Sequence, residues 1–381
     1  METEKINTGL YIHVPFCVKK CSYCSFYSIE CDEVLLTRFR STLLAELERK
    51  TAGINIGTVY AGGGTPTVLL PEFWSEFLST LDDVADTSDV LEMTIETNPG
   101  AVLPGVLAEF RKAGFNRLSI GIQSFISGEL KTLGRIHSPD QAIITFNQAR
   151  DTGFQNIGID LMYGIPGQIP DNWQSNLKKA VELSPEHISC YELSIEKGTP
   201  IADLINNGEL SKPSEEHCRE MYFLADEYLK KAGYIHYEVS NYARGDESIS
   251  RHNSSYWNRT PYIGLGPSAH SFDGKRIRSW NVCELNEYLS LIEYDRSPVE
   301  ETEELDSQEI ALEMLMLGLR WQAGADIEEI EATTGFRMNE QYLDRMVRSG
   351  RVQVSGSRIL PTAEGMLFAD GDAANLIEDL P

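Results

Sequence analysis

Apolar residues in the first two thirds of the chain recur in two alternating patterns. Short runs rich in Val, Ile and Leu, typical of buried strands, alternate with stretches in which apolar residues return every three or four positions, as on a helix face. The strand-like runs cover residues 10–16, 58–61, 91–96, 117–123, 157–163 and 187–193. The helical stretches cover residues 33–50, 71–81, 103–113, 140–152 and 171–183. A further helix is predicted over 214–232 and a strand over 235–239.

Repeated strand–helix units require a parallel sheet with right-handed crossovers. Six such units are compatible with an open doubly wound sheet or with an incomplete barrel. Polar residues lie at or just after the carboxyl ends of successive strands, namely Cys17, the glycine turn at 62–64, Glu96, Gln123, Asp160 and Glu192. In a barrel these ends converge on one mouth, where active sites are built. We therefore predict an α/β fold with an incomplete parallel (β/α)6 barrel that is similar to a TIM barrel.

The last eighty residues have a different pattern. Helices are predicted over 305–319, 326–333 and 339–349, and short strands over 351–354 and 358–361. Helices followed by a two-stranded wing indicate a C-terminal α+β domain similar to a winged helix. We thus divide the chain into a barrel core (1–240), a connecting segment (241–300) and a C-terminal domain (301–381).

The charge balance limits the partners of the protein. The chain has 33 basic and 58 acidic residues in 381, a formal charge of −25. Proteins that bind nucleic acid or anionic membranes generally show a basic surface, so we expect no nucleic-acid partner. No apolar run reaches the ~18 residues of a transmembrane segment, and the first residues lack the pattern of a secretion signal. We expect a cytoplasmic protein.

Three of the seven cysteines are clustered, as Cys17-x3-Cys21-x2-Cys24. An odd number of cysteines without a secretion signal argues against a disulfide framework. Structural zinc normally takes four protein ligands, and no fourth Cys or His stands at a matching spacing. His13 and Cys31 are the nearest candidates. Three thiolates on one short loop instead favour a [4Fe–4S] cluster with one iron open to a small chelating molecule.

Six motifs become informative together. They are YIHVPFC at 11–17, GGGTPT at 62–67, ETNP at 96–99, GIQSF at 121–125, DLMYGIP at 160–166 and the segment around His252. With them the chain resembles the radical S-adenosylmethionine (SAM) enzymes, in the branch of oxygen-independent coproporphyrinogen III dehydrogenases and radical SAM haem chaperones. The resemblance covers essentially the whole chain. It implies that Cys17, Cys21 and Cys24 hold the cluster and that SAM chelates its open iron.

The same resemblance assigns SAM contacts to eight positions. They are Tyr11, Gly63, Gly64, Thr65, Glu96, Gln123, Arg135 and Asp160. General chemistry agrees with several of them, because glycine lets a backbone approach a ligand closely and carboxylates accept hydrogen bonds from ammonium or ribose groups. In the competing structural interpretation, the glycines only form a tight turn and the carboxylates only cap helices.

The motif HNxxYW, at residues 252–257, is associated by the resemblance with the chaperone branch, where its histidine is a proposed haem ligand. Histidine is a common axial ligand of haem iron. Residues 241–280 also carry six Lys or Arg against three acids, and arginines pair well with carboxylates such as haem propionates. The alternative is that His252 is a hydrogen-bonded core residue.

Two functions are compatible with these motifs. The first is a chaperone that binds a [4Fe–4S] cluster, SAM and haem and delivers haem to apo-haem proteins. The second is a coproporphyrinogen III dehydrogenase, which converts two propionates to vinyl groups in porphyrin biosynthesis. In the dehydrogenases the cysteine motif continues to a fourth cysteine, where this chain has Phe26. That difference and the HNxxYW motif favour the chaperone, and the oligomeric state, a homodimer included, is left open.

Overall fold

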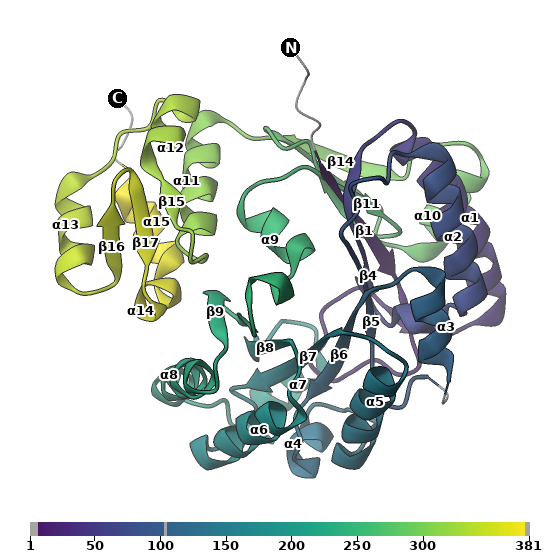
Figure 1. Ribbon diagram of the computed structural model, residues 1–381, viewed down its shortest axis with the longest axis horizontal. Helices are drawn as coiled ribbons and strands as arrows, with labels where there is room; N and C mark the ends of the chain where they lie inside the picture. Colours follow the sequence, from purple (N-terminus) through teal and green to yellow (C-terminus); the bar gives the residue numbers. More distant parts are fainter. Residues whose placement is uncertain (1–6, 103–104, 378–381) are drawn as a thin grey trace.

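A mixed sheet of twelve strands organises the core in the computed structural model, which describes residues 7–102 and 105–377 (Figure 1). Its seven central strands are parallel and lie in the order β11-β1-β4-β5-β6-β7-β8. They are β11 (Tyr262–Leu265), β1 (Thr8–Val14), β4 (Ile56–Gly63), β5 (Glu92–Thr97), β6 (Arg117–Gln123), β7 (Asn156–Tyr163) and β8 (His187–Glu192). The last six of these confirm the six strands predicted from the sequence.

Antiparallel strands extend the sheet at both edges. Beyond β8 lie β10 (Asn241–Ala243) and β9 (Ile235–Glu238). Beyond β11 lie β12 (His270–Phe272), β13 (Ile277–Asn281) and β14 (Val299–Glu304). The segment 241–300, which we expected to connect two domains, therefore contributes strands to both edges of the sheet.

Helices cover the outer face of the curved sheet and give it the form of a partial TIM-like barrel (Figure 1). The connecting helices are α1 (Glu33–Thr51), α2 (Pro71–Val84), α3 (Val106–Ala113), α5 (Pro139–Asp151), α6 (Pro170–Leu183) and α8 (Glu215–Lys231). Shorter elements are η1 (Pro66–Val68), α4 (Ser127–Thr132), α7 (Pro200–Asn206) and η2 (Asp246–Ser248). These helices confirm the predicted ones within a few residues, although 103–104, the start of the helix predicted over 103–113, lie outside the described residues.

Local chemistry explains where several helices begin. Ser138 starts α5 with a capping box, because its side chain accepts from the Gln141 amide while the Gln141 side chain accepts from the Ser138 amide. Pro71 and Pro170 each occupy the first turn of a helix, where the missing N–H of proline has no partner to lose. The apolar faces of these helices then pack on the core formed by the parallel strands.

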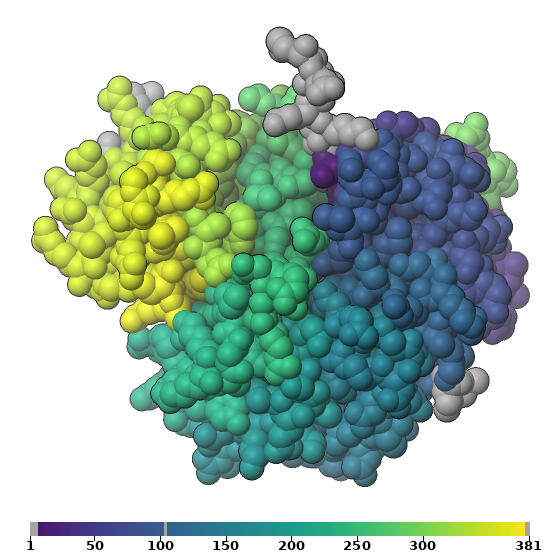
Figure 2. All heavy atoms as spheres, viewed as in Figure 1, coloured from purple at the N-terminus to yellow at the C-terminus, as the bar shows by residue number. Residues whose placement is uncertain are grey.

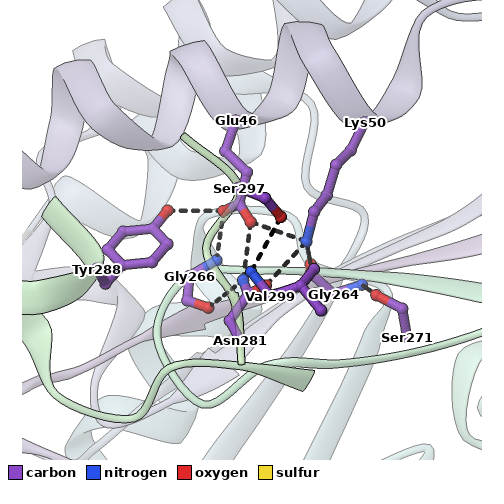
Figure 3. A network of polar contacts seen from close by, with 9 residues as sticks. All are labelled: Glu46, Lys50, Gly264, Gly266, Ser271, Asn281, Tyr288, Ser297 and Val299. Atoms are coloured by element: carbon purple, nitrogen blue, oxygen red, sulfur yellow. Dashed lines mark hydrogen bonds and ion pairs between the residues drawn. The ribbon is translucent and has the colours of Figure 1, made fainter. Parts of the chain in front are cut away.

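A buried carboxylate fixes the β11–β13 side of the sheet to α1 (Figure 3). Glu46 is 1 % exposed and forms an ion pair with Lys50 at 2.9 Å. It also accepts hydrogen bonds from the Gly266 amide (2.8 Å), Asn281 Nδ2 (2.8 Å) and the Tyr288 hydroxyl (2.6 Å), the last in α10 (Leu285–Glu293). Because buried charge is tolerated only with several partners, this network makes the later strands part of the core.

The C-terminal residues form a second hydrophobic core around a small sheet of the order β15-β17-β16. Its elements are α11 (Ser307–Gly318), β15 (Ala325–Asp326), α12 (Ile327–Thr334), α13 (Glu340–Arg348), β16 (Val352–Ser355), β17 (Arg358–Pro361), α14 (Ala363–Leu367) and α15 (Ala369–Leu376). Three helices, α11, α12 and α13, precede the β16–β17 hairpin, as the winged-helix-like pattern predicts, and α14 and α15 follow it.

This C-terminal domain packs against the end of the central sheet as a distinct lobe (Figure 2). Two backbone hydrogen bonds of 2.9 Å join it to β9, from Val239 N to Arg320 O and from Gln322 N to Tyr237 O. A bridge between Glu238 and Trp321 lies between them. The domain therefore covers the β9 edge, which would otherwise present unpaired backbone groups to solvent. Among the described residues, no helix has both the length and the apolar character to cross a membrane.

Candidate cluster and SAM site

A cavity of about 630 Å³ opens at the carboxyl ends of the parallel strands. Ten of the twelve predicted site residues line it: Cys17, Cys21, Cys24, Gly63, Gly64, Thr65, Glu96, Gln123, Arg135 and Asp160. They come from the cysteine loop between β1 and α1 and from four strands, β4, β5, β6 and β7, or the segments that follow them. The structure thus brings together residues that are up to 143 positions apart in the chain.

The glycine turn after β4 holds the start of the cysteine loop, which includes β2 (Phe16–Cys17) and β3 (Ile29–Glu30). The Gly64 amide donates to Val14 O and the Thr65 amide to Phe16 O, each at 2.8 Å. A Cβ on Gly64 would lie only 2.6 Å from Phe16 O, so a larger residue would separate the two segments. At least part of the need for glycine here is therefore structural, because it places Cys17.

A chain of polar side chains joins two of the cysteines. Thr65 Oγ1 lies 3.7 Å from Cys17 Sγ and accepts from Asn98 Nδ2 at 2.9 Å. Asn98 Oδ1 accepts from Arg135 at 2.6 Å, and the same guanidinium lies 3.4 Å from Cys21 Sγ. Partners of this kind orient metal ligands and adjust their basicity. Asn98 was not among the predicted site residues, although it lies within the ETNP motif.

The three cysteines have the chemistry of an iron–sulfur site. Cys17, Cys21 and Cys24 are partly exposed free thiols on one wall of the cavity, and Arg135 supplies positive charge beside them. Within the described residues, no three His, Cys, Asp or Glu side chains are gathered closely enough to hold a single metal ion. In a [4Fe–4S] cluster, each cysteine binds a different iron. The thiols therefore fit a multi-iron cluster better than one ion.

A strained backbone position lies at the end of β6, in the lining of the same cavity. Gln123, at the end of β6, has a φ of 66°, and the pairing with β7 shifts register between Gly121 and Gln123. A Cβ on Gly121 would lie 2.9 Å from Asn98 Oδ1 and 3.0 Å from Gln123 Nε2. Bulges of this type redirect a side chain near active sites. Here the bulge places Gln123 in the cavity lining.

Two buried carboxylates lie deeper in the cavity. Burial raises the pKa of Glu96 to about 7, although a 2.6 Å hydrogen bond from the Tyr60 hydroxyl opposes this shift. Burial also raises the pKa of Asp160, against the hydrogen bonds from Ser189 and Ser119. A cationic or hydroxyl-bearing ligand would favour the charged forms of both groups, which are then strong acceptors.

Tyr11 and His252 do not line this cavity. The Tyr11 hydroxyl lies 3.2 Å from His13 Nδ1, and its ring contacts the rings of Tyr60 and His252. His13 itself is buried and its Nε2 lies 2.9 Å from Tyr27 O.

His252 belongs to α9 (Arg251–Trp257) and is 1 % exposed. Its Nδ1 lies 2.8 Å from Thr58 Oγ1 and its Nε2 lies 2.9 Å from the Tyr256 hydroxyl. Burial lowers its pKa to about 3, with the charge of Arg117 adding to the effect. Both ring nitrogens are thus engaged within the protein, and iron ligation would require their release.

The helix α9 contributes to two cavities. Asn253 lies in the lining of the first, whereas Trp257 lies in that of a second cavity of about 580 Å³, between α9 and the C-terminal domain. Glu92 of β5 fixes the start of the helix, because it accepts from the amides of Arg251 (2.9 Å) and His252 (3.0 Å). The helix that carries the HNxxYW motif therefore lies between the two cavities and is fixed to β5.

Comparison with known proteins identifies the family. Residues 11–180 match the radical SAM superfamily and residues 305–368 match the HemN C-terminal domain. The chain is 34 % identical over 376 residues to "Heme chaperone HemW" of Mycobacterium tuberculosis, with 97 % of this chain and 94 % of that protein covered. The chain belongs to the HemW family. A HemW protein of Bacillus subtilis is 32 % identical over 94 % of this chain and 96 % of its own length.

Among solved structures, coproporphyrinogen III oxidase (HemN) of Escherichia coli has the same fold, with a TM-score of 0.83. It is 24 % identical in sequence, with 97 % of this chain and 90 % of that chain covered. Membership of the radical SAM superfamily implies a [4Fe–4S] cluster and SAM, in agreement with the cysteine loop and the cavity beside it.

Proposed function

We propose that this HemW-family chain is a haem chaperone that holds a [4Fe–4S] cluster and SAM, binds haem and delivers it to apo-haem proteins. The similarity to HemW proteins along nearly the whole length of both chains is the observation that carries this proposal. The likeness to coproporphyrinogen III oxidase (HemN) of E. coli supports a shared fold. Exposed Phe26, where the dehydrogenases are expected to have a fourth cysteine, agrees with the chaperone.

The residues of the site divide into groups with separate tasks in this proposal. Cys17, Cys21 and Cys24 would hold the cluster, with Thr65 and Arg135 beside two of their sulfurs. The remaining predicted SAM contacts, listed above from Tyr11 to Asp160, would bind or support SAM. Once the cluster is bound and reduced, it would supply an electron to SAM. His252 is kept as a proposed haem ligand, although it would first have to leave Thr58 and Tyr256.

One experiment separates the two candidate functions. The full chain would be reconstituted anaerobically with iron and sulfide, then titrated with haem and mixed with an apo-haem protein. We expect haem to bind and to pass to the recipient, as followed by its absorption spectrum. In parallel, coproporphyrinogen III, SAM and a reductant would be added and the porphyrin mass recorded. Loss of two carboxyl groups, abolished by Cys21→Ser, would contradict the proposal and establish the dehydrogenase.

A further inference from the structure

The floor of the first cavity contains a buried cation with unused hydrogen-bond donors. Arg117, the first residue of β6, is 2 % exposed and contributes to the cavity lining. Its Nε has no hydrogen-bond partner, and among the described residues no side chain accepts from its guanidinium. Such a group is costly to bury unless something else satisfies it. No role was assigned to Arg117 from the sequence.

His187, at the start of β8, presents a second unused group at the same place. Its Nε2 lies 2.8 Å from the Tyr237 hydroxyl, whereas its Nδ1 is buried without a partner. Burial, helped by the charge of Arg117, holds the pKa of His187 well below its usual value, so the ring is neutral. In the tautomer in which the Tyr237 hydroxyl donates to Nε2, the ring proton is on Nδ1, and His187 lines the cavity.

The two donors converge on the space above a glycine. A methyl group on Gly158 of β7 would lie 3.3 Å from Arg117 Nη2, 3.4 Å from His187 Nδ1 and 3.5 Å from Ser119 Oγ. Arg117 Nη2, His187 Nδ1 and Ser119 Oγ therefore lie close together beside Gly158, and Arg117, Ser119 and His187 all line the cavity. The Ser119 hydroxyl already donates to Asp160 at 3.2 Å, so the unused donors are those of Arg117 and His187.

The acids around Arg117 do not use its donors. Burial lowers the pKa of Arg117, but the charge of Glu92, with smaller contributions from Tyr60, Tyr237 and Asp160, outweighs this and raises it, so the guanidinium stays charged. Glu92 accepts from the first amides of α9, and Asp160 accepts from Ser119 and Ser189. Both carboxylates are therefore satisfied elsewhere and leave the guanidinium open to a guest.

We propose that Arg117 and His187, which lie close together in the lining beside Gly158, form a subsite for the carboxylate of a second ligand that enters the SAM cavity. A guanidinium with an adjacent neutral N–H donor suits a carboxylate, which accepts several charge-assisted hydrogen bonds. The carboxylate belongs either to the propionate arm of a tetrapyrrole or to a small free carboxylic acid. In the first case the inference rests on the proposed function and deepens it.

The test places a methyl group against the two donors. Gly158→Ala is compared with the wild type and with Gly128→Ala, whose added methyl group on α4 meets no atom within 4 Å. Full-length protein is titrated with sodium propionate against sodium chloride of equal ionic strength, and Tm is recorded. We expect propionate to raise Tm of the wild type and of Gly128→Ala, and to bind Gly158→Ala about tenfold or more weakly. Arg117→Lys, which keeps the charge and loses the planar fork, should behave like Gly158→Ala.

Equal effects of propionate and chloride on the wild type, or an unchanged propionate response in both variants, would overturn the subsite. A second comparison identifies the source of the carboxylate, with haem and its dimethyl ester as probes. Tighter binding of haem than of the ester, lost in Gly158→Ala, indicates a tetrapyrrole arm. Equal binding of both, together with the propionate effect, indicates a small acid. Failure of haem to bind at all would contradict the proposed function, while the propionate result would still decide the subsite.

Discussion

Asn98 links Cys17 and Cys21 indirectly, through one polar side chain beside each sulfur. Its amide donates to Thr65 beside Cys17, and its carbonyl oxygen accepts from Arg135 beside Cys21. The N–H groups and the carbonyl oxygen of the Asn98 side-chain amide point in fixed relative directions. Asn98 therefore keeps Thr65 and Arg135 at a fixed separation. An alanine would leave Thr65 and Arg135 free to turn away from the sulfurs.

We therefore predict that Asn98→Ala holds its cluster less well than the wild type. Loss of a residue that supports metal ligands typically lowers metal affinity about tenfold or more. The lifetime of the reconstituted cluster in the presence of a chelator, followed by its absorbance, measures this effect. The control is Asn286→Ala, on the exposed side of α10. Equal lifetimes for the two variants would show that the polar chain does not support the cluster.

The raised pKa of Glu96 predicts a dependence of stability on pH. The folded pKa is about 7 and the usual value is 4.5, so between these values the unfolded chain has lost a proton that the folded chain keeps. The free energy of unfolding then falls as pH rises through this window, by at most about 3 kcal/mol from this group. Glu96→Gln removes this pH-dependent fall in the free energy of unfolding, because the amide does not titrate. In SAM-free protein, the variant should gain stability relative to the wild type between pH 5 and pH 8 in urea unfolding, and a constant difference would contradict the assignment.

Most of the site could be predicted residue by residue, because cysteine spacing and strand-end positions are visible in the sequence. Nine of the ten predicted residues in the cavity lining stand in the cysteine motif or at a strand end, whereas Arg135, after α4, was assigned only by the family resemblance. Arg117 and His187 could not be found in this way, since each stands at the start of a strand, where polar residues are common. Their importance depends on partners that they lack, and such an absence is visible only in three dimensions.

At the scale of elements, the strands between α helices and the later strands β9, β16 and β17 were predicted, whereas β10 to β14 were missed. The parallel strands are buried apolar runs, whereas β14 is the sequence VEETEE with five exposed residues. β11 and β12 have only four and three residues. Strands so short or so polar lack both the apolar run and the alternation that indicate a strand. They form because the neighbouring strand supplies hydrogen-bond partners.

The helix α9 illustrates how a motif can be recognised while its role in the fold is not. His252 links α9 to β4 through Thr58 and stacks on Tyr60 with ring centroids 5.0 Å apart. We predict that His252→Ala lowers the free energy of unfolding by about 3 kcal/mol in haem-free protein, because two buried hydrogen-bond partners lose their bond. His217→Ala, exposed on α8, is the control.

A haem titration of the same two variants then addresses the proposed ligand role. A changed absorption spectrum in folded His252→Ala, with an unchanged one in His217→Ala, would support iron ligation by His252. Identical spectra would remove His252 from the iron and leave it as a residue that fixes α9 to the sheet.

For the whole molecule, the contact between the C-terminal domain and the sheet edge was beyond sequence reasoning. The winged-helix-like pattern was recognisable from helices and a hairpin, but the bonds to β9 are made by backbone groups, which are the same at every residue. No side-chain pattern therefore signals the backbone pairing with β9. The formal charge of −25 on the whole chain argued against one class of partner without indicating this contact.

We predict that Gln322→Pro loosens this interface. Proline lacks the amide that donates to Tyr237 O, whereas Gln322→Ala keeps it and serves as the matched control. Hydrogen exchange at Val239, whose amide pairs with Arg320 O, should become at least several-fold faster in the proline variant and remain unchanged in the alanine variant. Unchanged exchange in both would show that the domain is held by other contacts.

The position of α9 has a further consequence for binding. Asn253 and Trp257 belong to the same short helix yet face different cavities. Any guest that shifts this helix in one cavity changes the shape of the other. Thermodynamic reciprocity then requires that two guests, one in each cavity, alter each other's affinity by the same factor. A shift of the seven-residue helix α9 would therefore couple binding in one cavity to binding in the other.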